Sequence, residues 1–217
     1  MVPRTRMGDD LLRAYYEKGA RQLVILGAGF DARAYRMTGL DKLRVFEVDQ
    51  QTTFDVKEPL LKGEPLSVAS RAVVATEFTE RGRWAKDLID AGYDREVPSV
   101  WLLEGLLMYL SIEDTKDLMR HMGNLSAPGS AVFHDACSAS YVQSRIVVGG
   151  APFIGGSDKY AELWAQHAGF ERAYVRDFSS ISVDRVNRQL VIDQRVPEAT
   201  PQNCAGHNVV LFVQAEK

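Results

Sequence analysis

The stretch at residues 22–36, QLVILGAGFDARAYR, decides the fold class of this chain. Its apolar part ends in Gly27-Ala28-Gly29, and a second apolar run ends in Glu47-Val48-Asp49, about 20 residues further on. A buried strand that ends in a glycine turn, followed by a strand tipped with an acidic residue, is typical of a nucleotide-binding half-fold. The absent side chains let a ligand lie against the backbone of the turn.

The glycine pattern bears on two classes of ligand. The residue three places after Gly29 is Ala32, which a dinucleotide fingerprint tolerates, whereas Asp31 puts a carboxylate in the first turn of the next helix. That carboxylate would repel a pyrophosphate, but it suits a ligand with a cationic amino group, such as the methionine part of S-adenosylmethionine. The alternative is structural: the glycines only form a strand-to-helix turn, and Asp31 only caps the helix.

Length and composition indicate one ordinary globular domain over residues 1–217. A net charge of -3 argues against a nucleic-acid partner. Cys137 and Cys204 are too few for a disulfide framework, and no group of acids and histidines has metal-ligand spacing, so we expect no metal. No run reaches the roughly 18 apolar residues that span a bilayer, and the N-terminus lacks the apolar part of a signal peptide. We therefore expect a cytoplasmic protein with no membrane partner.

Apolar runs alternate with helical stretches along the chain, which predicts an α/β sheet. The expected strands are residues 22–26, 43–48, 72–75, 99–103, 130–134, 173–177 and 208–213, and the expected helices are 9–18, 112–125 and 157–168. The last two strands are joined by a long polar connection in which no full crossover helix is expected, so the last one is expected to run antiparallel. A Rossmann-like, seven-stranded, mostly parallel sheet with an antiparallel terminal strand is the class I methyltransferase fold, whereas a dinucleotide oxidoreductase more often continues with parallel units.

Four successive strand ends carry an acid, at the edge of the sheet where ligands bind. The residues at these ends are Glu47 and Asp49, Glu77 with Phe78, Glu104, and His134 with Asp135. A ring of acids is wrong for an anionic ligand but suits S-adenosylmethionine. Asp49 can accept from the ribose hydroxyls, Glu77 can lie near the adenine amine, and Phe78 can pack on the adenine face. Glu104 then faces the ammonium or sulfonium, while Arg4 or Arg6 supplies a cation for the methionine carboxylate.

The segments LGAGFDARAYR, VFEVDQ and EGLLMYLS, with RTRMGDDLL upstream, resemble the leucine carboxyl methyltransferase family, including its bacterial S-adenosylmethionine-dependent O-methyltransferase branch. The resemblance runs from about Arg4 to the fifth strand and resumes at the last strand. It implies that Arg4 holds the methionine carboxylate, that Gly27 lies beside the cofactor, that Asp49 binds the ribose, and that Glu104 lines the cofactor site. The family usually has an aspartate where this chain has Glu77.

Two segments differ from the family pattern. Only residues 1–3 precede Arg4, which makes a short N-terminal cap, and the part at 136–158 is a short lid. Its glycine pairs, Gly149-Gly150 and Gly155-Gly156, predict a mobile loop. Three alternatives follow: the pocket is open, a second subunit closes it, or the chain is a shortened form. A homodimer is our hypothesis for the second case.

The resemblance implies O-methylation of an acceptor, either a small molecule or a protein C-terminal carboxylate. A carboxylate acceptor is ionised at neutral pH and needs no base, whereas a hydroxyl needs one. His134 is the candidate base, with Tyr109 as an orienting group. Two alternatives stay open: a non-catalytic cofactor-binding or interaction protein on the same fold, and an NAD-dependent oxidoreductase.

Overall fold

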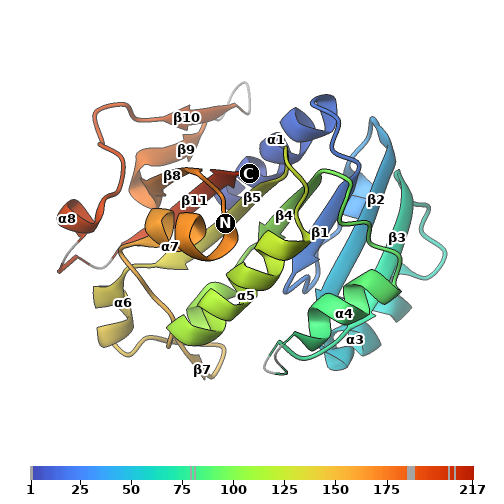
Figure 1. Cartoon of the computed structure of the whole chain (residues 1–217), viewed down its shortest axis with the longest axis horizontal. Helices are drawn as coiled ribbons and strands as arrows, with labels where there is room; N and C mark the ends of the chain where they lie inside the picture. Colours follow the sequence, from blue (N-terminus) through green and yellow to red (C-terminus); the bar gives the residue numbers. More distant parts are fainter. Residues whose placement is uncertain (1, 79, 81, 185–188, 205, 208) are drawn as a thin grey trace.

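A seven-stranded sheet forms the centre of the molecule (Figure 1). The computed structural model describes residues 2–78, 80, 82–184, 189–204, 206–207 and 209–217. The sheet has the order β3-β2-β1-β4-β5-β11-β8, from strands β1 (Gln22–Leu26), β2 (Leu40–Asp49), β3 (Val68–Ala75), β4 (Ser99–Leu103), β5 (Ala131–Cys137), β8 (Arg172–Asp177) and β11 (Val210–Glu216). The strand order reverses between β1 and β4, which creates a crevice at their carboxyl ends.

Strand directions agree with the predicted fold class. β1 pairs in parallel with β2 and β4, and the outer pairs β2–β3 and β4–β5 are parallel as well. β11 runs antiparallel to both of its neighbours, β5 and β8. The prediction of a mostly parallel sheet with an antiparallel terminal strand is confirmed. β3 begins earlier than predicted, at Val68, and the predicted start of the last strand at residue 208 lies outside the described residues.

The two central strands owe their apolar sequences to burial on both faces of the sheet. Every residue of β1 and β4 is buried. Because side chains alternate along a strand, Val24 and Leu26 pack into one core, whereas Leu23 and Ile25 pack into the other. A continuous apolar run is therefore the sequence signature of such a strand.

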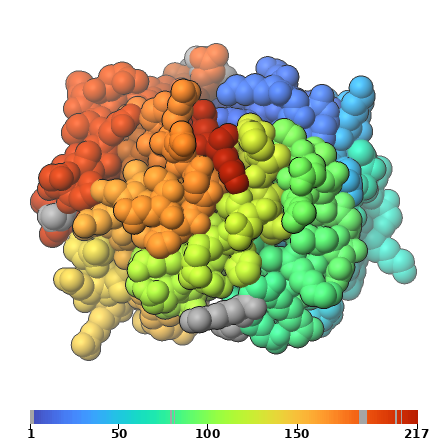
Figure 2. Space-filling model, in the orientation of Figure 1, coloured from blue at the N-terminus to red at the C-terminus, as the bar shows by residue number. Residues whose placement is uncertain are grey.

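Helices cover both faces of the sheet (Figure 1). On one face lie α4 (Arg83–Asp90), α5 (Ile112–Leu125) and α7 (Tyr160–Ala168), which form the near surface in Figure 2. On the other lie α1 (Val2–Glu17), α2 (Arg33–Arg36) and the hairpin of β9 (Ile181–Val183) and β10 (Leu190–Ile192). The remaining elements are α3 (Gln51–Leu61), η1 (Leu107–Tyr109), α6 (Ala139–Gln143), β6 (Val147–Val148), β7 (Ala151–Pro152), η2 (Phe178–Ser180) and α8 (Pro201–Cys204).

The helices expected from the sequence are present with shifted ends. The helix at 112–125 is as predicted, and the Ser111 hydroxyl caps it by accepting from the backbone N–H of Asp114 at 3.1 Å. The helix predicted at 9–18 begins already at Val2, and the one predicted at 157–168 begins at Tyr160. Among the described residues, no helix has both the length and the apolar character to cross a membrane.

The segment at 136–158 is held more firmly than its glycines indicate. Gly149 and Gly150 form the turn of the β6–β7 hairpin with positive φ, but Gly155 is buried. A Cβ atom on Gly155 would overlap the carbonyl oxygens of Leu107 and Leu110. The close approach of two backbones therefore gives a packing reason for the Gly155-Gly156 pair, and the mobility of the loop stays a prediction.

Candidate functional site

The glycine turn after β1 is built against the end of β2. Gly27 and Gly29 have positive φ values of 70° and 45°, which favour glycine. The backbone N–H groups of Gly27 and Ala28 both donate to the carbonyl of Val48, at 2.9 and 3.1 Å. A Cβ on Gly29 would meet nothing within 4 Å, so the turn presents bare backbone to open space.

Asp49, at the tip of β2, holds this turn in place. Its Oδ2 accepts from the backbone N–H of Gly29 at 2.7 Å, and its Oδ1 accepts from the N–H of Gln50 at 2.7 Å and from the Thr53 hydroxyl at 3.0 Å. A carboxylate has about four acceptor positions, so roughly one of them is left for a ligand. Asp49 thus couples the glycine turn to the start of α3.

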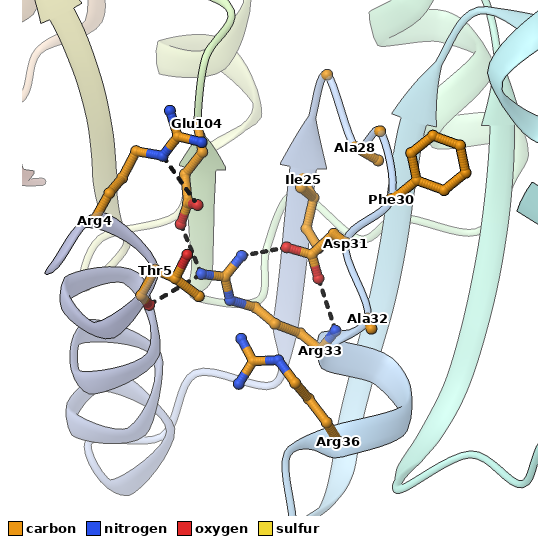
Figure 3. Close-up of a pocket in the computed structure, with 12 residues that line it drawn as sticks. Arg4, Thr5, Ile25, Ala28, Phe30, Asp31, Ala32, Arg33, Arg36 and Glu104 are labelled. Carbon is orange, nitrogen blue, oxygen red and sulfur yellow. Dashed lines mark hydrogen bonds and ion pairs between the residues drawn. The ribbon is translucent and has the colours of Figure 1, made fainter. Parts of the chain in front are cut away.

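A cavity of about 440 Å³ lies between α1 and the glycine turn (Figure 3). Its walls come from α1, β1, the turn, α2 and the residue after β4, and comprise Arg4, Thr5, Ile25, Gly27, Ala28, Gly29, Phe30, Asp31, Ala32, Arg33, Arg36 and Glu104. The structure therefore brings together five of the residues predicted for the cofactor site: Arg4, Gly27, Gly29, Asp31 and Glu104. The exposed ring of Phe30 points away from the charged groups.

Arg33, which our sequence reasoning missed, organises the charges around the cavity. Its side chain is only 1% exposed. Figure 3 shows its guanidinium between two acids: Nη2 lies 2.6 Å from Glu104 Oε1, and Nη1 is paired with Asp31 Oδ2. On the side of α1, Nε donates to Asp9 Oδ1 at 2.8 Å. One buried cation thus ties the N-terminal helix, the glycine turn and the end of β4 together.

The close approach of α1 depends on Gly8. A Cβ on this residue would lie 2.6 Å from Glu104 Oε1 and 2.8 Å from Arg33 Nη2, so any larger residue would displace this ion pair. Glycine in the middle of a helix is normally unfavourable, so its presence at this position has a packing reason. A glycine inside the RTRMGDDLL segment is the one sequence signal that points to this contact.

Arg4 lies at the other end of the same charge network. Its Nη1 donates to Asp135 Oδ2 at 2.7 Å, and its Nε lies 3.6 Å from Glu104 Oε2. The second oxygen of Asp135 accepts from the backbone N–H of Gly105 at 2.6 Å. Burial raises the pKa of the Glu104 carboxyl, and the neighbouring Arg33 and Arg4 only partly offset this.

Glu77 and Phe78 do not line the cavity. Both follow β3, where Glu77 accepts from the side-chain amide of Gln50 at 3.0 Å, and the Phe78 ring packs against Trp84. Glu77 is exposed and Phe78 is half-buried. They lie beyond Asp49 on the same edge of the sheet, so their predicted contact with an adenine remains untested.

Glu47 is not part of the ring of acids that the sequence analysis placed at this edge. Its side chain is fully buried and pairs with Lys57 Nζ and Arg71 Nη2, both at 2.6 Å. It sits two residues before the end of β2, under α3, so it cannot reach the crevice. The interpretation of Glu47 as a ligand-facing acid was wrong, and its role is to form a core ion pair.

His134 does not reach the site either. The residue is fully buried, its Nε2 accepts from the indole N–H of Trp164 at 2.8 Å, and its Nδ1 lies 3.3 Å from the carbonyl oxygen of Asp135. Burial lowers the pKa of this imidazole to about 4. Tyr109 is also outside the cavity and packs edge-on against Phe153. This geometry argues against the predicted roles of His134 as a base and of Tyr109 as its orienting group.

Metal ligands are also sparse. No group of three His, Cys, Asp or Glu residues in the described part of the chain has the geometry to hold a metal ion. Cys137 and Cys204 are free and buried, and burial raises the pKa of the Cys137 thiol to about 12. Neither thiol has the low pKa of a reactive cysteine.

The sheet order and the crevice above β1 and β4 define a Rossmann-like protein of the class I methyltransferase architecture. Residues 1–123 match the family described as Leucine carboxyl methyltransferase, which is more than half of the chain. This chain therefore belongs to the leucine carboxyl methyltransferase family.

Individual relatives agree with this assignment. A protein of Parafrankia sp., provisionally named an S-adenosyl-L-methionine-dependent methyltransferase, is 36% identical over 165 residues, which are 76% of this chain and 52% of the relative. The solved structure of a SAM-dependent methyltransferase from Archaeoglobus fulgidus superposes with a TM-score of 0.59 over 98% of this chain and 94% of that one, at 14% identity. An O-methyltransferase family protein from Burkholderia thailandensis gives a TM-score of 0.56 over 98% and 56%, at 13% identity. The structural likenesses bear on the fold alone, and this chain spans about half the length of the curated relatives it matches.

Proposed function

We propose that this protein binds S-adenosylmethionine at the cavity beside the glycine turn and transfers its methyl group to an oxygen atom of an acceptor. The observation that carries the proposal is the paired arrangement of charge around this cavity. Arg4 offers a cation on one side, while Asp31 and Glu104 offer anions facing the bare backbone of the turn. A zwitterionic amino acid attached to a nucleoside matches this arrangement. Membership of the family adds support from an independent direction.

The residues present fit the cofactor. Arg4 would hold the methionine carboxylate, and Asp31 and Glu104 would receive the ammonium. Asp49 retains an acceptor position for a ribose hydroxyl next to Gly29, where a Cβ would meet open space. The adenine would extend towards Glu77 and Phe78, at the exposed end of β3.

The cofactor supplies an activated methyl group on a sulfonium sulfur. What this chain contributes is positioning: fixed charges hold one reactant while the acceptor oxygen is aligned with the bond that breaks. A carboxylate acceptor is already ionised and needs no base. The burial of His134 and its bond from Trp164 favour such an acceptor over a hydroxyl. We therefore propose a carboxylate, on a small molecule or at a protein C-terminus, as the acceptor.

The NAD-dependent alternative is disfavoured by the same features. A pyrophosphate is usually bound at the N-terminus of a full helix, but α2 has four residues and Asp31 stands two residues before its start. The two carboxylates that face the cavity would repel a diphosphate. A non-catalytic protein on the same fold would bind the cofactor without turning it over, so methyl transfer separates this alternative from an enzyme.

Calorimetry tests the proposed ligand. The wild-type protein is titrated with S-adenosylmethionine, S-adenosylhomocysteine and NAD, and so are the variants Asp49→Ala and Glu104→Ala. Glu58→Ala serves as a matched control, because this acid pairs with Arg71 on the outer surface, away from the cavity. We expect micromolar binding of both adenosyl ligands, loss in the two site variants, no change in the control and no binding of NAD. Failure of the wild-type protein to bind either adenosyl ligand would refute the proposal.

The acceptor is tested next with radiolabelled methyl donor. Panels of carboxylic acids, phenols and peptides with free or amidated C-termini are compared. Transfer to free carboxylates, sensitive to esterase and absent from the amidated peptides, is the expected result. Transfer to phenols alone would overturn the carboxylate proposal. Cytoplasmic location, homodimer formation and the lack of a nucleic-acid partner remain predictions, of which sedimentation over the working concentration range tests the second.

A further inference from the structure

Two carboxylates in the cavity share one buried cation. Asp31 and Glu104 are each about one-eighth exposed, at 12% of their side-chain surface, and both face the cavity. The Arg33 guanidinium lies between them and is itself 1% exposed. Like charges that are both largely buried on one cavity wall destabilise each other unless a cation lies between them. The geometry makes Arg33 the group that compensates both acids, and its charge opposes the rise that burial causes in the pKa of Glu104.

The contacts of these acids leave room for a ligand. Glu104 Oε1 accepts from Arg33, whereas among the described residues the cation nearest its Oε2 is the more distant Arg4 Nε at 3.6 Å. Asp31 is held on both oxygens by Arg33, through the backbone N–H and through Nη1. The two acids are thus fixed in position by one residue, and the open oxygen of Glu104 lies on the side of Arg4.

We propose that Arg33 is a positioning residue for the amino group of the cofactor: it orients Asp31 and Glu104 by direct ion pairs, so that together they accept an ammonium. This inference rests on the proposed function. Arg33 itself does not contact the amino group, because two cations would repel each other. Its planar fork bonds three acids at once, since Asp9 holds the third side, and a lysine could not do the same from a single nitrogen.

The inference predicts a particular pH dependence. The charged groups that face Glu104 are Arg33 from α2, Arg4 from α1 and Asp31 from the glycine turn, and Asp135 from β5 stands behind Arg4. Burial already raises the pKa of Glu104, and Arg33 is the main opposing influence. Removal of Arg33 raises this pKa further, so a neutral carboxyl replaces the anion that the ammonium needs. Binding should then recover only at higher pH.

The experiment compares S-adenosylhomocysteine with 5′-methylthioadenosine, which has the same nucleoside but no amino-acid part. Affinities are measured by calorimetry from pH 6 to 8.5 for wild type, Arg33→Met, Arg33→Lys and Glu104→Gln. Arg71→Met is the matched control, because Arg71 is another buried arginine that pairs with two acids, but outside the cavity. The methylthioadenosine affinity reports whether each variant keeps its folded nucleoside site.

We expect Arg33→Met to lower the affinity for S-adenosylhomocysteine by about tenfold to a hundredfold near neutral pH, which is the range for hydrogen bonds to charged groups. The affinity for methylthioadenosine should stay nearly unchanged. The loss should shrink as the pH rises. Arg33→Lys should bind S-adenosylhomocysteine more weakly than wild type, with a nearly normal pH profile. Glu104→Gln should bind it weakly at every pH. Arg71→Met should bind both ligands normally.

Three results would overturn the inference. Arg33→Met could bind S-adenosylhomocysteine as tightly as wild type, or it could lose both ligands equally with an unshifted pH profile, which would indicate a purely structural role. If Arg33→Met does not fold, a Glu104→Gln variant that binds S-adenosylhomocysteine normally refutes the role assigned to the anion. Wild-type protein that binds neither ligand would instead refute the proposed function, and the two failures are therefore distinguishable.

Discussion

Replacement of Glu47 by glutamine should cost stability and leave ligand binding intact. Glu47 is fully buried, and Lys57, whose side chain is 2% exposed, is paired with it at 2.6 Å. In the Glu47→Gln variant this ammonium stays buried with no anion, a situation that costs about 3–5 kcal/mol. The effect on Arg71 is smaller, because Arg71 keeps its ion pair with Glu58 at 2.7 Å, and Glu58 is exposed to water.

Replacement of Lys57, the other member of the pair, should cost less stability. In Lys57→Met, Glu47 still has Arg71 at 2.6 Å, so no charge is left alone, and we expect a loss of about 1–2 kcal/mol, the order of one hydrogen bond. The expected difference between the two variants is therefore about 2–3 kcal/mol. Such a difference is a large part of the total stability of a domain, which is usually about 5–15 kcal/mol.

Urea unfolding measures this difference. The fluorescence of three buried tryptophans, Trp84, Trp101 and Trp164, follows loss of the core between the sheet and the helices α4, α5 and α7. Calorimetry with S-adenosylhomocysteine is run on the same variants below their unfolding transitions and should give wild-type affinity. Equal losses for Glu47→Gln and Lys57→Met, or a loss of affinity in the folded Glu47→Gln protein, would refute the reasoning.

Three further outcomes follow from the structure. Burial lowers the pKa of His134 from 6.5 to about 4, so the neutral imidazole stabilises the fold fully above pH 6.5, and this stability is lost as the pH falls towards 4. Over this pH window the wild type should lose about 3 kcal/mol more of its unfolding free energy than His134→Gln. Urea titrations at several pH values measure this difference. Gly155→Ala should lower the urea midpoint by an amount equal to about 1–3 kcal/mol, the usual cost of overpacking, and an unchanged midpoint contradicts the close contact of its backbone. Asp135→Asn keeps an acceptor for the N–H of Gly105 but removes the charge opposite Arg4, so S-adenosylhomocysteine should bind about tenfold more weakly while 5′-methylthioadenosine does not change.

Local signals were enough to predict the sheet. Most of its strands contain a short apolar run, and the two central ones, which are apolar except for Gln22 and Ser99, are covered on both faces. The antiparallel direction of the last strand was predicted because no crossover helix was expected in the polar connection between the final two runs. The β9–β10 hairpin was missed, because its connection is polar and only Ile181 among its residues is fully packed into the core. Short strands of this kind carry too little periodicity to be distinguished from a loop.

The cavity was predictable in part. Gly27, Gly29 and Asp31 are neighbours in sequence, and their relation to Glu104 follows from the convergence of parallel strands at one edge of the sheet. Arg33 was missed since an arginine at the start of a helix usually points to solvent. Only the folded chain reveals that Asp9 and Glu104, from distant parts of the sequence, meet on its guanidinium.

The errors at Glu47 and His134 have a common physical origin. A sequence places residues near the end of a strand but does not say on which side of that end they lie, or which face they occupy. Along β5, Phe133 packs with the core under α1, so His134 must point to the opposite face, where Trp164 of α7 binds it. Asp135 turns back towards α1 and meets Arg4. One position along a strand therefore separates a residue buried in the core from a residue that pairs with a cavity side chain, and the alternation of strand side chains decides which of the two neighbours lies on the side of the cavity.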